Sequence, residues 1–172
     1  MIHGNDSESP QHAARLLRDI EQAMDVLSQI SEERSAVPPA PGKWSPREVI
    51  GHLIDSASNN HVRFVRAALE EDMIFPGYEQ DGWVSVQRYG EASWRDLLDL
   101  WAAFNRHLAR TMAGIPINPR RRQRDRHNLD RIAFKAVPAG TPATLDYFMD
   151  DYVDHLEHHL RQVLGSWPPK MS

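Results

Sequence analysis

The sequence has 172 residues and contains no cysteine. This excludes disulfide bonds, thiolate metal ligands and a cysteine nucleophile, so any metal site must use nitrogen or oxygen ligands from histidine, aspartate or glutamate. No apolar run approaches the roughly 20 residues of a transmembrane helix. The start, MIHGNDSESPQH, lacks the basic segment and apolar stretch of a signal peptide. We therefore expect a cytoplasmic protein without a membrane anchor.

An excess of positive charge is also missing. The formal net charge is -4 at pH 7, which gives no general attraction to nucleic acid or to an anionic membrane. One local segment, NPRRRQRDRHNLDR, is basic and could bind phosphate or an anionic cofactor. Nucleic-acid binding there is an alternative, although the segment lacks interleaved aromatic residues. The simplest interpretation is a solvated loop, partly balanced by Asp125 and Asp130, that carries six arginines: Arg120, Arg121, Arg122, Arg124, Arg126 and Arg131.

Four segments show the spacing of amphipathic helices. They cover residues 10–33, 46–70, 94–114 and 144–164. The second has a well-defined start, because Ser45, Pro46 and Glu48 form a capping box with proline at the first helical position. Four helices without a strand pattern predict an all-α four-helix bundle. We expect one domain over residues 1–172, with its core at about 10–165.

The segment between the second and third predicted helices has no periodicity. It mixes glycine, proline and aromatic residues, which indicates a long ordered loop with short helical turns, and such loops are often functional. Its aromatic residues could line the mouth of a pocket or could be structural; they are Phe75, Tyr78, Trp83 and Tyr89.

The last predicted helix contains the segment DHLEHHL. A helical projection at 100° per residue places His155 and His159 together at the edge of the buried face, whereas His158 points elsewhere and is expected at the surface. Two histidines four residues apart are neighbours on a helix and can bind one metal ion. A third ligand must then come from another helix.

The second predicted helix carries a polar stripe of His52, Ser56 and Asn60 beside its apolar face. Burying such groups is costly unless they are hydrogen-bonded or used. A metal ion bound by His52, His155 and His159 would use part of the stripe and leave one position open, as in catalytic zinc sites. The plain alternative is a set of hydrogen-bonded histidines without metal.

Two further polar residues on this helix have alternative interpretations. Asp55 could orient the His52 ring as ligating histidines commonly require, or it could face solvent. Arg63 lies on the same side as His52 and could bind a substrate carboxylate, or it could reach solvent. The residues alone do not choose between these roles.

Two motifs resemble the DinB/YfiT-like superfamily. GKWSPREVIGHLIDSASNNHVRFVRA is similar to the start of its second helix, with a tryptophan-serine start, a histidine, aspartate-serine and asparagine, and DHLEHHLRQV is similar to its last helix. The resemblance implies an up-down-down-up four-helix bundle with zinc or nickel on His52, His155 and His159. It also makes a homodimer plausible. We assign Asp55 and Asn60 as candidate catalytic residues that orient a ligand or contact the substrate.

The resemblance also implies a class of reaction. Characterised members resemble S-transferases or isomerases that use bacillithiol, mycothiol or glutathione, and others have been proposed as hydrolases. We therefore expect a metal-dependent enzyme that transfers a low-molecular-weight thiol to an electrophilic small molecule. A metal-dependent hydrolase and a non-enzymatic module that binds a small ligand or metal are the alternatives.

Overall fold

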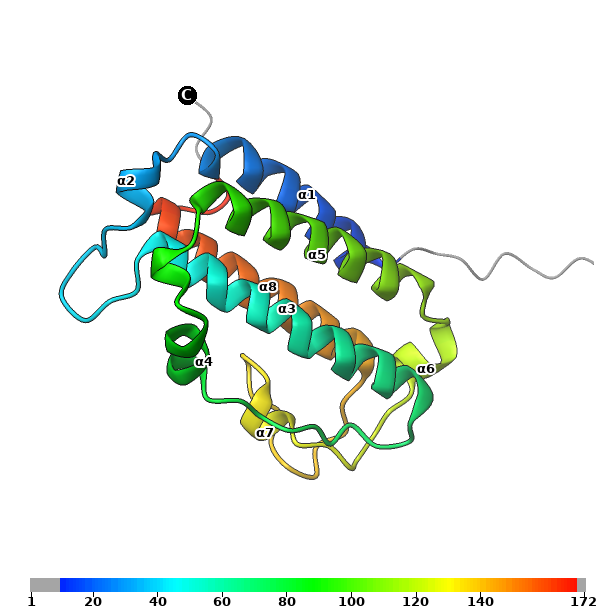
Figure 1. Cartoon of the computed structure of the whole chain (residues 1–172). Helices are drawn as coiled ribbons and strands as arrows, with labels where there is room; N and C mark the ends of the chain where they lie inside the picture. Colours follow the sequence, from blue (N-terminus) through cyan, green and yellow to red (C-terminus); the bar gives the residue numbers. More distant parts are fainter. Residues whose placement is uncertain (1–9, 170–172) are drawn as a thin grey trace, which may run out of the picture.

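The computed structural model describes residues 10–169 and is built around four long helices (Figure 1). The segment MIHGNDSESPQH, which is expected not to be a signal peptide, lies mostly outside these residues. Two helices, α1 and α8, run in one direction and two, α3 and α5, in the other, which confirms the predicted up-down-down-up bundle. Each of α1 and α3 packs against both α5 and α8. The long helices are α1 (Gln11–Leu27), α3 (Pro46–Leu69), α5 (Trp94–Gly114) and α8 (Leu145–Leu164).

The connections contain short helices. In the segment between α3 and α5, α4 (Gln80–Gln87) and the 3₁₀ helix η1 (Tyr89–Glu91) supply the helical turns that the sequence predicts. The remaining short helices are α2 (Glu32–Ser35), α6 (Ile117–Arg121) and α7 (Leu129–Ile132). No helix within residues 10–169 combines the length and the apolar character needed to cross a bilayer.

The start of α3 follows the predicted capping box. The Ser45 hydroxyl accepts a hydrogen bond from the Glu48 backbone N–H, and the Glu48 carboxylate accepts one from the Ser45 backbone N–H at 2.7 Å. The hydroxyl groups of Ser93 and Thr144 cap α5 and α8 in the same way. Each cap satisfies an N–H group that the helix itself leaves without a partner.

The first helix is shorter than the sequence predicts. It ends at Leu27 rather than near Glu33, and the Leu27 carbonyl accepts hydrogen bonds from the Ile30 backbone N–H at 3.0 Å and from the indole N–H of Trp94 at 3.1 Å. Ser31 then caps the separate helix α2 through its hydroxyl, which accepts from the Arg34 backbone N–H. A local turn and a contact from a distant helix therefore meet at this end.

The interpretation of the basic segment as a solvated loop is wrong for two of its arginines. Arg124 is buried, and its guanidinium donates to backbone carbonyls of four residues: Ala67, Glu71, Pro119 and Arg122. Arg120 is also buried and pairs with Asp146 at 3.1 Å. Arg124 thus fastens the basic segment to the end of α3. Contacts within the protein therefore engage part of the positive charge of this segment.

Candidate metal centre

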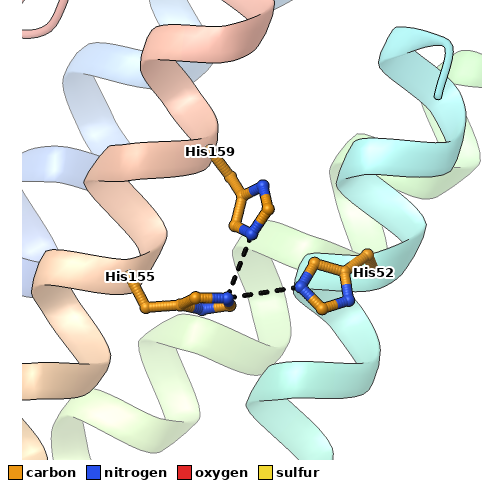
Figure 2. A group of neighbouring side chains, drawn as sticks. All are labelled: His52, His155 and His159. Carbon is orange, nitrogen blue, oxygen red and sulfur yellow. Dashed lines mark hydrogen bonds between the residues drawn. The ribbon is translucent and has the colours of Figure 1, made fainter. Parts of the chain in front are cut away.

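Three imidazole rings converge between α3 and α8 (Figure 2). His52 projects from α3 and is fully buried, while His155 and His159 project from adjacent turns of α8 and are half-buried. The Nε2 atom of His155 lies 3.3 Å from Nε2 of His52 and 3.0 Å from Nε2 of His159. The structure therefore brings together the three histidines that the sequence singles out.

The spacing of the three nitrogens suits a small divalent ion. Zinc binds imidazole nitrogen at about 2.0–2.1 Å, and at tetrahedral angles this separates two nitrogens by about 3.3 Å. The two Nε2 separations lie close to that value. The donor set thus fits a metal ion, with three neutral nitrogens and room for a further ligand.

Burial keeps these rings neutral. Loss of water lowers the pKa of His52 to about 3, and a nearby histidine adds to the effect. Burial likewise lowers the pKa of His159 to about 4 and that of His155 well below its ordinary value. Within residues 10–169, no carboxylate forms an ion pair with any of the three rings. Neutral imidazole is the form that binds metal, so these shifts favour coordination near neutral pH.

Two side chains orient the rings of α8. The Nδ1 atom of His159 lies 2.9 Å from Oε1 of Gln162, and Nδ1 of His155 lies 3.4 Å from the hydroxyl of Ser56. Because the amide oxygen of Gln162 only accepts, Nδ1 of His159 carries the proton and Nε2 keeps its lone pair for a metal. The sequence places Ser56 in the polar stripe, whereas it gives no signal for Gln162.

His52 has a different environment. Its Nδ1 atom is buried and has no hydrogen-bond partner within residues 10–169, and the ring packs against Trp44 at a centroid distance of 5.0 Å. Apart from the contact of its Nε2 with His155, packing therefore positions this ring.

The expectations for Asp55 as a His52 partner or a solvent-facing residue are both wrong. Asp55 is buried, and its Oδ1 accepts 2.7 Å hydrogen bonds from the Gln87 amide and from the Tyr89 hydroxyl. It fastens α4 and η1 to α3. Its burial follows from the packing of these segments against α3, which the periodicity of α3 alone does not reveal.

A cavity of about 380 Å³ adjoins the histidines. Asn60 lies in its wall, and its amide donates to the Ser56 carbonyl at 2.9 Å. Asn60 is thus placed where a substrate could contact it. Asp151 also lines the cavity and accepts hydrogen bonds from the backbone N–H groups of Phe134 and Lys135. The main polar and aromatic lining residues are Ser56, Asn60, Arg63, Tyr78, Arg131, Phe134, Asp151, His155, His158 and His159.

The aromatic residues of the loop between α3 and α5 have separate roles. Tyr78 lines the cavity, and burial raises the pKa of its hydroxyl to about 12. Trp83 packs against Tyr78 at a centroid distance of 4.9 Å but does not line this cavity. Phe75 and Tyr89 are buried structural residues. Of the four, only Tyr78 thus lines the cavity beside the histidines, whereas Phe75 and Trp83 line a separate, smaller cavity.

Two residues near the histidines were not predicted correctly: His158 was expected at the surface, and Phe134 was not predicted at all. His158 is half-buried and lines the cavity, so its placement at the surface is wrong. Phe134 packs against His158 at 5.1 Å and against His155 at 5.5 Å. It lies in a segment without helical periodicity, so no sequence pattern points to it.

Comparison with known proteins gives the family. The model of the DinB superfamily matches residues 15–163. The chain belongs to the DinB superfamily. A solved structure, YfiT from Bacillus subtilis, described as a probable metal-dependent hydrolase with an unusual four-helix bundle topology, superposes with a TM-score of 0.73 at 17% identity and covers 95% of this chain and 87% of YfiT. At this identity the likeness shows the shared fold.

Two curated relatives match shorter segments, and each is described as a putative metal-dependent hydrolase. The protein from Bacillus licheniformis is 29% identical over 72 residues, which cover 40% of this chain and 41% of the relative. The protein from Bacillus mycoides is 26% identical over 77 residues, which cover 45% and 39%. The chain thus matches about two fifths of the length of either relative.

Proposed function

We propose that this DinB superfamily protein is a metal-dependent enzyme that acts on a small molecule in the cavity beside His155 and His159. The observation that carries the proposal is the convergence of three neutral imidazole Nε2 atoms at the edge of this cavity. His52, His155 and His159 would hold zinc or nickel. When bound, such an ion lowers the pKa of a coordinated water or thiol and so supplies a nucleophile at neutral pH.

Hydrolysis is the first candidate reaction. It is supported by the descriptions of both Bacillus relatives and of YfiT as metal-dependent hydrolases. In this reaction His158 is the side chain best placed to accept or return a proton, because its imidazole lines the same cavity and is outside the ligand set. Asn60 would orient the substrate.

Thiol transfer to an electrophile is the second candidate. The specific observation in its favour is that both oxygens of Asp151, the acidic residue of the cavity lining, accept backbone hydrogen bonds. Among the described residues the cavity thus offers no free carboxylate as general base. A thiol ionises on binding to a metal and does not need one.

Metal analysis tests the centre. Protein purified without an affinity tag or chelator should contain about one equivalent of zinc or nickel, and His155→Ala should lose it, because tetrahedral binding requires all three histidines. His107→Ala is the matched control, since His107 is exposed on α5. Wild-type protein that neither contains nor takes up metal would overturn the proposal.

Turnover then separates the two reactions. The metal-loaded protein is assayed against a panel of esters and amides, and against monochlorobimane with bacillithiol, mycothiol or glutathione. Metal-dependent hydrolysis supports the first candidate, and metal-dependent formation of the bimane thioether supports the second. Failure of both with a fully loaded protein favours a binding module.

A further inference from the structure

Arg63 is a buried cation with no anionic partner among the described residues. Its exposed fraction is 6%. One guanidinium nitrogen donates to Oδ1 of Asn60 at 3.4 Å and another to the Pro76 carbonyl at 2.9 Å. Removing a guanidinium from water without a counter-ion is costly, so this position requires an explanation.

The other buried arginines of the described chain are balanced differently. Arg47 and Arg120 form ion pairs with Glu32 and Asp146. Arg124 has no such pair, but its guanidinium donates to four backbone carbonyls. A guanidinium has five N–H donors, and Arg63 uses only two of its nitrogens in these contacts. Arg63 therefore keeps both its charge and spare donors.

Arg63 borders two cavities, one beside the histidines and a smaller one of about 270 Å³ beside Pro76. It lies in the lining of the first together with two of the three histidines. The acidic residue of that lining, Asp151, is already bonded to two backbone N–H groups. Arg131 lines the same cavity, but its side chain is 82% exposed and pairs with Asp130 at 3.5 Å. Arg63 thus leaves a positive charge at this cavity without a carboxylate partner among the described residues.

The Arg63 guanidinium and the three histidines lie at different heights along the axis of α3. Ser56, which contacts His155, and Arg63 are seven residues apart on the same side of the helix, a separation of about 10 Å along its axis. Asn60 lies between them and contacts both Ser56 and Arg63. A ligand can therefore reach the imidazoles at one end and the guanidinium at the other.

We propose that Arg63, supported by Asn60, binds a carboxylate of the substrate at the end of the cavity away from the three histidines. This rests on the proposed function, since it names the substrate class of the same cavity: a small carboxylic acid whose reacting group lies several bonds from the carboxylate. A planar carboxylate pairs with two parallel N–H groups of a guanidinium. The cavity of about 380 Å³ accommodates a small acid of this kind.

Titration calorimetry on the zinc-loaded protein tests the proposal with two probes, 6-mercaptohexanoic acid and 6-mercaptohexanamide. The thiol of each probe binds zinc, and only the acid carries the carboxylate. The wild type should bind the acid at least tenfold more tightly than the amide. Arg63→Gln should lose this preference and keep its affinity for the amide. Arg66→Gln is the matched control, because Arg66 is half-buried on the same helix, pairs with Glu70 and does not line the cavity beside the histidines.

A second variant tests the proposal independently in case Arg63→Gln fails to fold. Asn60→Asp places a carboxylate beside the guanidinium, so it should raise the melting temperature and abolish the preference for the acid. Equal binding of both probes by a zinc-loaded wild type would overturn the carboxylate site and leave the metal centre intact. Absence of zinc binding would instead overturn the proposed function.

Discussion

The hydroxyl of Tyr89 donates a 2.7 Å hydrogen bond to Oδ1 of Asp55, a buried carboxylate 34 residues earlier in the chain. The Gln87 amide donates to the same oxygen at 2.7 Å. Burial raises the pKa of Asp55, and the two hydrogen bonds oppose that rise. This network holds the segment between α3 and α5 against the bundle.

We expect Asp55→Ala to destabilise the fold without emptying the metal centre. The substitution removes the acceptor of both Tyr89 and Gln87 and should lower the free energy of unfolding by about 1–3 kcal/mol, measured by urea denaturation. Asp99→Ala, at an exposed position of α5, should change it by less than about 0.5 kcal/mol. Loss of bound metal in Asp55→Ala would contradict the structural role assigned to this carboxylate.

Gly51 allows η1 to pack closely on α3. A Cβ atom at this position would lie 2.2 Å from Cδ2 and Cγ of Tyr89. Gly51→Ala should therefore lower the free energy of unfolding by about 1–3 kcal/mol through overpacking. Gly114→Ala, where a Cβ meets nothing within 4 Å, should be neutral or stabilising by up to about 1 kcal/mol. Denaturation curves of the two variants with equal midpoints would contradict this contact.

Gln162 should tune metal affinity through His159. Its Oε1 accepts from Nδ1 of that ring at 2.9 Å, and loss of such a partner typically weakens metal binding about 10–100-fold. Competition with a chromogenic zinc chelator measures the change in Gln162→Ala. Gln22→Ala, exposed on α1, should bind zinc as the wild type does. An unchanged affinity in Gln162→Ala would show that this hydrogen bond does not support coordination.

Asp19 should make stability depend on pH. Burial, and then the charge of Glu157, raises its pKa to about 7 from an ordinary value of 3.8. The folded state thus keeps a proton that the unfolded state releases. The stabilisation of the folded state by this proton is therefore fully present below about pH 3.8 and is lost as the pH rises through about 7. Asp19→Asn cannot ionise.

The stability of Asp19→Asn relative to the wild type should therefore increase from pH 4 to pH 8. Urea denaturation of both proteins at the two pH values gives this difference. Asp25→Asn, exposed on the same helix, should show no such trend. A difference between Asp19→Asn and wild type that is the same at both pH values would contradict the raised pKa.

Helix starts were predictable because their determinants are local. The capping side chains of Ser45, Ser93 and Thr144 each accept from a backbone N–H three residues later, so a short stretch of sequence contains both partners. The end of α1 was not predictable in this way. Besides the Ile30 N–H, its last carbonyl is bonded to the indole of Trp94, 67 residues away, and no local pattern contains that second partner.

By itself, the sequence determined which residues share a face of each helix. The periodicity placed His155 with His159, and His52 with Ser56 and Asn60, because the helical repeat fixes directions around one axis. Only the tertiary structure decided what each face contacts. It brought His52 to the pair on α8, buried Asp55 under Tyr89, and enclosed Arg63 without a counter-ion from the described part of the chain. The physical reason is that such contacts depend on how separate helices and loops pack, and packing joins residues that no local spacing relates.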